Sequence, residues 1–196
     1  MRKTKAVCRR APVHLICFLL LPLLCLCCGD PAPEEGTERP AEERSAIEER
    51  LITELSPVDD LAGRQRNAII NRAIDQNYDV YAAPEGYFYE VLDSGEFSYL
   101  AEGDLLSVHY TGRFLDGTEF DGSRKRGDPL RFRLGDLITA WNLALRRVRP
   151  GARLRILTPS SLAYGAGGLV SPRGDTLVPA DEPLEFLIEE ISIMEE

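Results

Sequence analysis

The sequence predicts an α+β fold, in which a twisted antiparallel sheet of five to six strands wraps around one short helix and is preceded by a short helical segment. In residues 84–196, apolar and polar residues alternate in short segments that are separated by turn signals, which is typical of antiparallel sheet. One stretch of this region has helical spacing instead. A lone short helix among several strands favours a sheet that curls around it.

Residues 1–28 predict a signal peptide. The first 27 residues contain five bases and no acid, and an apolar run extends from Leu15 to Cys28. This run is shorter than the roughly 20 apolar residues that a membrane-spanning helix requires. It is therefore typical of an export signal, and an uncleaved N-terminal anchor is the alternative.

The cysteines of this segment resemble the end of a bacterial lipoprotein signal. All five cysteines lie in the first 28 residues; small Cys27 precedes Cys28, and polar Gly29 and Asp30 follow it. The resemblance implies that Cys28 is lipidated and anchors the chain to a membrane, since several acyl chains give stable anchoring. In the lipoproteins that this segment resembles, an aspartate directly after the lipidated cysteine is the signal for retention in the inner membrane. Gly29 stands there in this chain, which favours the outer membrane. We therefore expect a lipid-anchored protein of the bacterial cell envelope, on the periplasmic face of the outer membrane.

Residues 29–40 predict a flexible acidic tether. They contain three prolines, two glycines, four acids and no large apolar side chain, so they cannot form a packed core.

The composition excludes several classes of function. The formal net charge of −9 argues against nucleic acid as a partner, because phosphates repel an acidic protein. The chain has two histidines, His14 and His109, and no cysteine after residue 28. The sequence therefore predicts neither a metal site nor a thiol nucleophile, and a Ser-His-Asp triad would depend on His109 alone. We interpret His109 as structural.

Residues 41–80 predict two helices. The first covers residues 41–55 and ends at Ser56-Pro57; the second covers residues 61–77, with Asp59 or Asp60 as its N-cap. The apolar residues at helical spacing are Ile47, Leu51, Ile52 and Leu55 in the first helix and Leu61, Ala62, Ile69, Ile70, Ala73 and Ile74 in the second. Such short helices are marginal alone in water. They pack either on the chain's own domain or on a second copy, as a homodimer through residues 41–80.

Residues 84–196 predict five main strands and one helix. The strands are expected over residues 86–93, 105–114, 129–134, 152–159 and 183–193, and the helix over residues 137–148. A hairpin turn is expected over residues 115–118, where Gly117 can adopt a positive φ. Glu190 stands where the alternation of the last strand requires an apolar residue, which predicts a bulge or a frayed strand end.

From about Glu90 to the C-terminus, the chain resembles an FKBP-type peptidyl-prolyl cis-trans isomerase. The resemblance rests on four segments in the family's order: VHYTGRFLDGTEFDGSRKRGDPLRFRLG, LITAW, RPGARLRILTPSSLAYGAGG and VPADEPLEFLIEEI. It implies the family's fold, a twisted antiparallel sheet on a short helix. It also implies the family's activity, which requires no cofactor and no metal.

The resemblance implies an aromatic pocket for a proline residue. Trp141 would form its floor, Tyr110, Phe120 and Phe186 its aromatic walls, and Leu137, Ile138, Val178 and Leu130 its aliphatic walls. Leu130 replaces the phenylalanine that is usual in the family. The Ile138 amide and the Tyr164 hydroxyl would donate to bound carbonyl oxygens, and Asp121, held by Arg126 five residues later, would face the imide. Of these residues, Asp121, Tyr164, Tyr110 and Phe186 are assigned as catalytic and the others as substrate-binding.

Aromatic walls suit this chemistry. Rotation about a peptide bond has a barrier of about 18–20 kcal/mol because amide resonance is broken, and isomerisation of X-Pro takes roughly tens to hundreds of seconds unaided. Twisting the imide reduces the charge on its oxygen, so a dry apolar pocket favours the twisted form over the planar form.

The predicted function is a peptidyl-prolyl cis-trans isomerase that assists the folding of exported or envelope proteins. Its partners would be proline-containing unfolded polypeptides. The alternative is a non-catalytic FKBP-like chaperone or partner-binding module. Two departures from the family keep this alternative open: Ala140 replaces the usual glycine, and the loop over residues 165–178 is longer than in small single-domain members.

Overall fold

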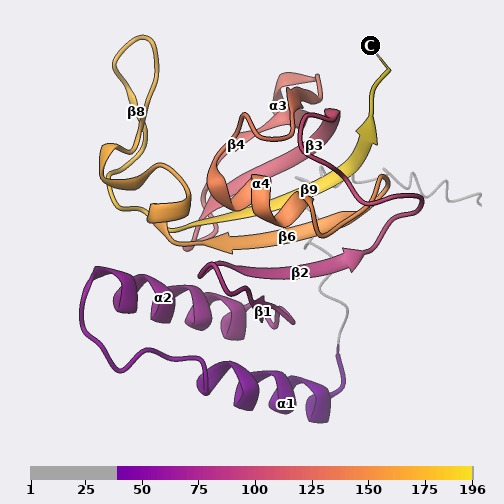
Figure 1. Ribbon diagram of the computed structural model, residues 1–196. Helices are drawn as coiled ribbons and strands as arrows, with labels where there is room; N and C mark the ends of the chain where they lie inside the picture. The colour runs from indigo at the N-terminus through magenta and orange to yellow at the C-terminus, as the bar shows by residue number, and fades with distance from the viewer. Residues whose placement is uncertain (1–38, 196) are drawn as a thin grey trace, which may run out of the picture. The chain divides into compact units, whose positions relative to one another are not determined.

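The structure is a computed structural model that describes residues 39–195 (Figure 1). The predicted signal peptide with its lipidation residue Cys28, and residues 29–38 of the predicted tether, lie outside the described residues. All described residues fall within one compact unit. Between residues 39 and 195, no helix is long and apolar enough to cross a membrane.

The described chain is α+β, as predicted. Its helices are α1 (Ala41–Ile52), α2 (Leu61–Asp75), α3 (Ser123–Arg126) and α4 (Thr139–Leu145), with short 3-10 helices η1 (Ser160–Leu162) and η2 (Gly165–Gly167). Its strands are β1 (Tyr81–Ala82), β2 (Phe88–Asp93), β3 (Leu105–Phe114), β4 (Glu119–Gly122), β5 (Leu130–Arg133), β6 (Arg153–Thr158), β7 (Leu169–Val170), β8 (Thr176–Val178) and β9 (Leu184–Ile193).

Seven of the described strands form an antiparallel sheet in the order β1-β2-β6-β9-β3-β4, with β5 also paired to β3. One edge of the ten-residue β3 pairs with β9, and its other edge is shared by β5 near its start and β4 near its end. Between these two partners, the Ser123 hydroxyl accepts the backbone N–H of Tyr110 at 2.9 Å. The Tyr110 N–H on this edge of β3 therefore has an acceptor, although neither β4 nor β5 pairs with the strand at that residue.

Some elements differ from the sequence prediction. β1 and β4 are two and four residues long, too short for an alternating pattern to be recognised. α4 begins two residues later than predicted because Ile138, with a ψ of 150°, is not helical, and it ends at Leu145 rather than at residue 148. At Glu190 the predicted bulge is confirmed: its φ is 52°, and β9 has one residue more than β3 between their neighbouring pairs.

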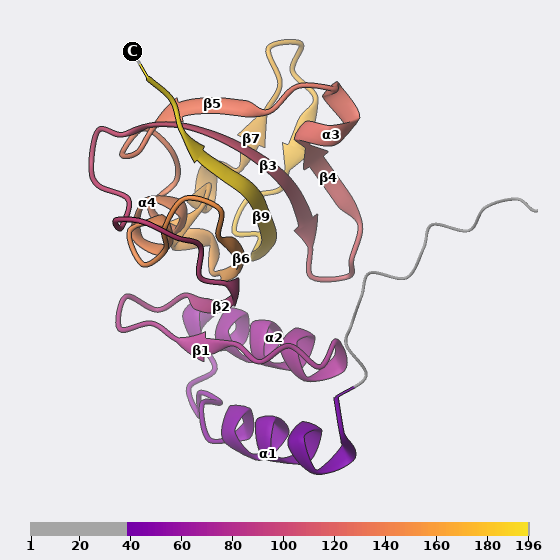
Figure 2. The same ribbon diagram turned by 90° about the vertical axis from the view of Figure 1, so that its right-hand side faces the viewer.

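The sheet curls around α4 on one face (Figures 1 and 2). Alternate residues of each strand point into this core, and Trp141 and Leu145 of α4 complete it. From the two central strands β3 and β9, the core receives Leu106, Val108, Tyr110, Leu184, Phe186 and Ile188. The period of two along a strand explains why these residues share one face.

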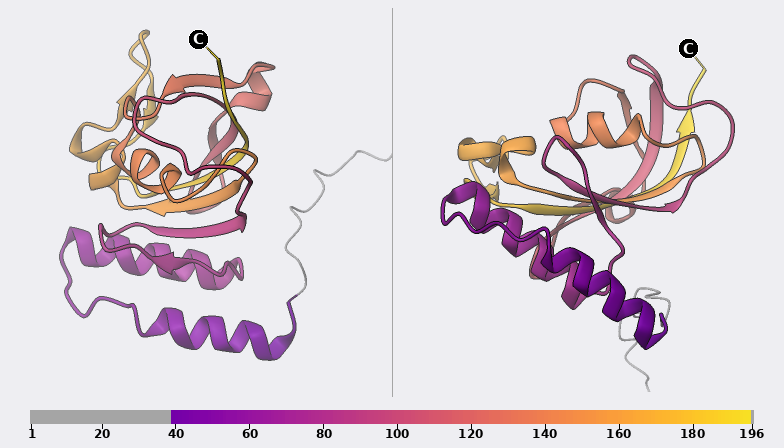
Figure 3. Two further views of the ribbon diagram at one scale, coloured as in Figure 1. Left: turned by 45° about the vertical axis from the view of Figure 1, so that its right-hand side comes forward. Right: turned by 60° about the horizontal axis from the view of Figure 1, so that its bottom comes forward.

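α1 and α2 cover the opposite face of the sheet, with α2 between α1 and the strands (Figures 1 and 3). Asp60 is the N-cap of α2 and accepts the Gly63 backbone N–H at 2.7 Å. A second core joins the two helices to Phe88 of β2 and Leu157 of β6. The hairpin therefore packs on its own domain, which is one of the two arrangements expected from the sequence. The homodimer through residues 41–80 stays a prediction.

The expected buried faces of the two helices are partly wrong. Ile47, Leu51, Ile69, Ile70 and Ala73 are buried, and Ile74 packs beside them, but Ile52, Leu55, Leu61 and Ala62 are exposed. Ile52 follows the fully buried Leu51 by one residue, which turns it about 100° away on a helix. Leu55 lies beyond the end of α1, where helical spacing no longer holds.

A buried charged cluster joins the hairpin to the sheet. Glu185 of β9, whose side chain is 1% exposed, accepts from Arg72 Nε of α2 at 2.9 Å and from the Tyr78 hydroxyl at 3.0 Å. Arg155 of β6 lies 3.7 Å from Glu185 through Nε and 2.5 Å from Glu90 of β2 through Nη1. Burial, followed by the charge of Glu185, raises the pKa of Tyr78 to about 12, so this hydroxyl stays a donor. Buried carboxylates require such partners.

Replacing Arg72 with methionine should lower the free energy of unfolding by about 3 kcal/mol, because the buried Glu185 carboxylate loses its nearest cation. Urea denaturation of the full chain measures this change. Arg64→Met is the matched control: Arg64 lies on α2 like Arg72, and it pairs with Asp59 before the helix at 3.1 Å, with side chains that are 60% and 89% exposed. An exposed pair contributes at most about 1 kcal/mol, so equal losses in the two variants would contradict the role of the buried cluster.

Candidate active site

Aromatic side chains from three strands converge on Trp141, the only tryptophan of the chain. The ring centroids of Tyr110 (β3), Phe186 (β9) and Phe132 (β5) lie 5.2, 5.5 and 6.0 Å from that of Trp141. The ring planes meet at 84°, 87° and 66°, which is the edge-to-face arrangement that aromatic quadrupoles favour. The short helix thus places the indole where the strands meet.

Phe120 of β4 extends this aromatic cluster. Its ring meets that of Phe186 edge to face, with 5.9 Å between centroids. Gly112 of β3 leaves room for both rings, because a Cβ there would lie 2.8 Å from Phe120 Cζ and 3.1 Å from Phe186 Cε1. A side chain at residue 112 would therefore displace one of the two rings.

Asp121, Arg126 and the Tyr110 hydroxyl form a polar edge beside the rings. The Tyr110 hydroxyl donates to Asp121 and accepts from Arg126 Nη2 at 3.0 Å. Arg126 also pairs with Asp121, because α3 turns the chain back within the five-residue spacing. The Gly122 backbone N–H donates to Asp121 Oδ1 at 2.8 Å. Three donors therefore fix the orientation of the carboxylate.

Both tyrosine hydroxyls of the site are protonated at neutral pH. Burial, followed by the hydrogen bond to Asp121, raises the pKa of Tyr110 to about 12. Burial also raises the pKa of Tyr164, and the negative charge of Asp121 adds to the rise. The Tyr110 hydrogen is engaged by Asp121, whereas Tyr164 is a neutral donor that can serve a carbonyl oxygen.

The other expected site residues surround the aromatic cluster. Val178 is buried in the same core, and Leu130, Leu137, Ile138 and Tyr164 are partly buried and packed against it. The structure therefore brings together all eleven residues that the sequence assigns to the pocket. Their roles toward a substrate stay predictions.

The segment before α4 holds a backbone amide beside the cluster. Ile138 immediately precedes α4, and the first N–H groups of a helix have no acceptor in a preceding turn. Asn142 fixes this segment: its Nδ2 donates to the Leu137 carbonyl at 2.7 Å, and its amide shares two 3.1 Å hydrogen bonds with the backbone of Gly135. Donation from the Ile138 amide to a ligand stays a prediction.

The sequence prediction does not contain Phe132 and Asn142. Phe132 follows Leu130 by two residues and faces the same core, so the alternation of the strand could have found it. The partners of Asn142 depend on the conformation of residues 135–137, for which the sequence has no signal.

His109 lies on the opposite face of β3 from Tyr110, because neighbouring residues of a strand point to opposite faces. Its Nδ1 lies 3.0 Å from the Ser123 hydroxyl, and its Nε2 lies 3.9 Å from Glu190. These contacts agree with a structural interpretation of His109.

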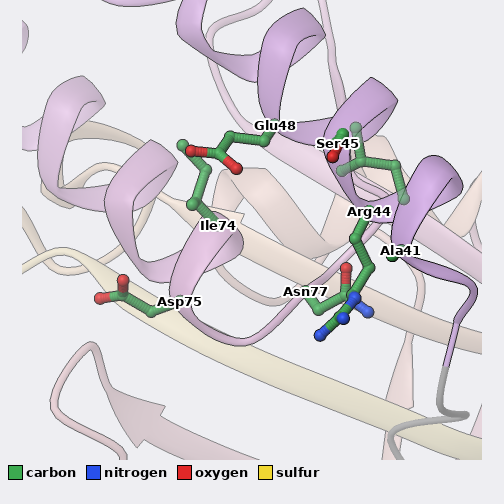
Figure 4. Close-up of a pocket in the computed structure, with 8 residues that line it drawn as sticks. Ala41, Arg44, Ser45, Glu48, Ile74, Asp75 and Asn77 are labelled. Carbon is green, nitrogen blue, oxygen red and sulfur yellow. The ribbon is translucent and has the colours of Figure 1, made fainter.

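A separate hollow of about 350 Å³ lies between the start of α1 and the end of α2 (Figure 4). Arg44, Ser45 and Glu48 of α1 line it, together with Asp75 and Asn77. None of the described residues that line it is aromatic. The hollow therefore differs from the site around Trp141, where aromatic rings converge.

Known proteins are similar to this chain in sequence and in fold. The sequence model of the family described as FKBP-type peptidyl-prolyl cis-trans isomerase matches residues 98–190. The macrophage infectivity potentiator of Trypanosoma cruzi is 48% identical over 90 residues, which are 46% of this chain and 43% of that protein. The FKBP-type peptidyl-prolyl cis-trans isomerase FkpA of Escherichia coli is 36% identical over 100 residues, which are 50% of this chain and 37% of that protein. The crystal structure of FkpA from Escherichia coli matches with a TM-score of 0.57 and 25% identity, over 76% of this chain and 64% of that chain.

The region that matches the family contains the aromatic cluster and its polar edge. The similarity covers less than half the length of the two curated relatives. Residues 98–190 are therefore similar in sequence to the FKBP-type peptidyl-prolyl cis-trans isomerase domain, and the fold of the described residues is similar to that of FkpA.

Proposed function

We propose that this chain is a peptidyl-prolyl cis-trans isomerase that acts on X-Pro bonds of unfolded exported or envelope polypeptides. The observation that carries the proposal is the convergence of Tyr110, Phe132 and Phe186 on Trp141, beside a carboxylate fixed by three donors. These residues lie inside the region that matches the family.

The proposed mechanism weakens the resonance of the imide without a covalent bond to the enzyme. The substrate proline packs on Trp141, where aromatic rings replace water. The planar imide carries more charge on its oxygen than the twisted imide, so the loss of water destabilises the planar form more. This difference lowers a barrier that is about 18–20 kcal/mol for amide rotation.

Polar groups at the rim orient the substrate. The Ile138 amide and the Tyr164 hydroxyl hold substrate carbonyl oxygens, and Asp121 faces the imide. Because Tyr110, Gly122 and Arg126 already fix the Asp121 carboxylate, it acts on the imide without a reorganisation of its surroundings.

A coupled cis-trans assay with X-Pro peptides and the full chain tests the proposal. Phe186→Ala should lower kcat/KM most, by about a hundredfold, since it removes the ring that contacts Trp141 and Phe120 and alters the position of the bound imide. Tyr164→Phe should lower it about fivefold, the equivalent of one hydrogen bond of about 1 kcal/mol. Asp121→Ala should fall between these two values.

Phe88→Ala is the matched control for Phe186→Ala. Phe88 is fully buried on the opposite face of the sheet, in the core beneath the hairpin. Its loss should lower stability by roughly 3–5 kcal/mol, as for other buried phenylalanines, yet leave kcat/KM of the folded fraction unchanged. A wild-type chain that binds unfolded polypeptides without accelerating isomerisation would favour the non-catalytic binding module.

The isomerase rate should stay constant between about pH 6 and about pH 9, because no proton is transferred. The raised pKa values keep Tyr110, at about 12, and Tyr164 protonated through this range, so their hydrogen bonds are lost only as the pH rises toward those values. Initial rates across the pH range measure this. His109→Gln is the control, and a rise through neutral pH that disappears in this variant would indicate acid–base catalysis by His109.

For the residues outside the described range, the proposal includes a lipid anchor at Cys28. The five bases, the short apolar run and the Cys27-Cys28-Gly29 sequence support it. The anchor would hold the isomerase domain in the bacterial cell envelope, at the periplasmic face of the outer membrane, where unfolded exported chains arrive.

Labelled palmitate should be incorporated into the wild-type chain in a bacterial host and should be lost in Cys28→Ser. Cys17→Ser is the matched control and should keep the label, because Cys17 lies within the apolar run rather than at its end. Label that persists in Cys28→Ser would assign the anchor to Cys25 or Cys27, or would exclude a lipoprotein signal.

A further inference from the structure

A buried amide of the hairpin contacts two loops of the isomerase domain. Gln65 of α2 is 6% exposed and lies outside the residues that match the family. Its Oε1 accepts the Ser160 backbone N–H at 2.9 Å, and its Nε2 donates to the Asp181 carbonyl at 2.5 Å. The Ser160 hydroxyl lies 3.0 Å from the same Nε2. One side chain therefore connects two loops to α2.

These two loops adjoin Tyr164 and Val178, the last residue of β8, in the candidate site. Ser160 begins η1, the 3-10 helix that leads to Tyr164. Asp181 follows Val178 by three residues, and its backbone N–H donates to the carbonyl of Gly165 at 2.9 Å. Gln65 therefore holds the chain on both sides of Tyr164, directly at Ser160 and through Asp181 at Gly165.

The backbone of Asp181 lies in the left-handed region. Asp181 has a φ of 57°, which is uncommon for a residue other than glycine and persists only where the surroundings stabilise it. In Figures 1 and 3, the N-terminal half of α2 lies next to the loops between β6 and β9. Ser160 is buried, and without Gln65 its backbone N–H would lose its hydrogen-bond acceptor. A buried donor without an acceptor lowers the stability of the conformation in which it occurs.

We propose that Gln65 is a positioning residue of the isomerase site, which acts through Tyr164. It fixes the loop of Tyr164 relative to the aromatic cluster, so the hairpin contributes to catalysis as well as covering the sheet. This inference rests on the proposed function, because it assigns Gln65 to the same site.

Gln65→Met tests the inference, because methionine keeps the length of the side chain and removes both hydrogen-bonding groups. In the full chain it should lower kcat/KM for X-Pro peptides by up to about fivefold, the effect of Tyr164→Phe, because a residue that acts through the Tyr164 hydroxyl can remove no more than the contribution of that hydrogen bond. Asn67→Leu is the matched control. Asn67 also lies on α2, but its amide binds only the backbone of Ser56 within the hairpin, at 2.8 and 3.0 Å. It should leave kcat/KM unchanged.

A double-mutant cycle with Tyr164→Phe separates positioning from a general loss of structure. If Gln65 acts through Tyr164, Gln65→Met should change kcat/KM less than about twofold once the Tyr164 hydroxyl is absent. Equal losses in both backgrounds would overturn the inference, as would an equal loss in Asn67→Leu.

Amide hydrogen exchange distinguishes failure of the inference from failure of the proposed function. Exchange at Ser160 and Asp181 should accelerate in Gln65→Met and not in Asn67→Leu, while Ile156 in the sheet should not change. An active wild type whose exchange is unaffected by Gln65→Met would overturn the inference alone. An inactive wild type would overturn the proposed function, and the role of Gln65 with it.

Discussion

The burial of one sheet on both faces is the constraint on which the rest of this structure depends. Strands β2, β6 and β9 present one set of alternate residues to α4 and the other set to the helical hairpin. The second face combines apolar Phe88 and Leu157 with the carboxylate of Glu185, which is stable there because Arg72 and Tyr78 of the hairpin segment reach it. The hairpin therefore covers this face of the sheet through both apolar packing and ion pairs.

The first face carries the aromatic cluster on which the proposed isomerase function rests. Trp141 and the rings around it belong to the hydrophobic core, so the rings that stabilise the domain are also the ones proposed to contact a proline ring. The polar groups are confined to the edge of this cluster, where Arg126 and Tyr110 partner Asp121. On β4, the aromatic ring of Phe120 and the carboxylate of Asp121 come from neighbouring residues.

The two faces are not independent of each other. Phe186 contacts Trp141 on one side of β9, while Glu185, the preceding residue, binds Arg72 on the other side. The hairpin also reaches around the sheet through Gln65 to the loops that follow β6 and precede β9. The helices outside the family region are therefore structurally continuous with the site, although the motifs of the family do not contain them.

The sequence by itself determined the α+β class, the long strands, the short helix around Trp141 and the bulge at Glu190. Alternation, helical spacing and the family's motifs are local in the chain, and they also identified the residues that gather at the site. Only the tertiary structure decided that the hairpin packs on its own sheet, that Phe132 joins Trp141, and that Gln65 binds Ser160 and Asp181. These contacts join residues far apart in the chain, and a contact or a hydrogen bond depends on distances and directions that exist only after the sheet and the helices have packed.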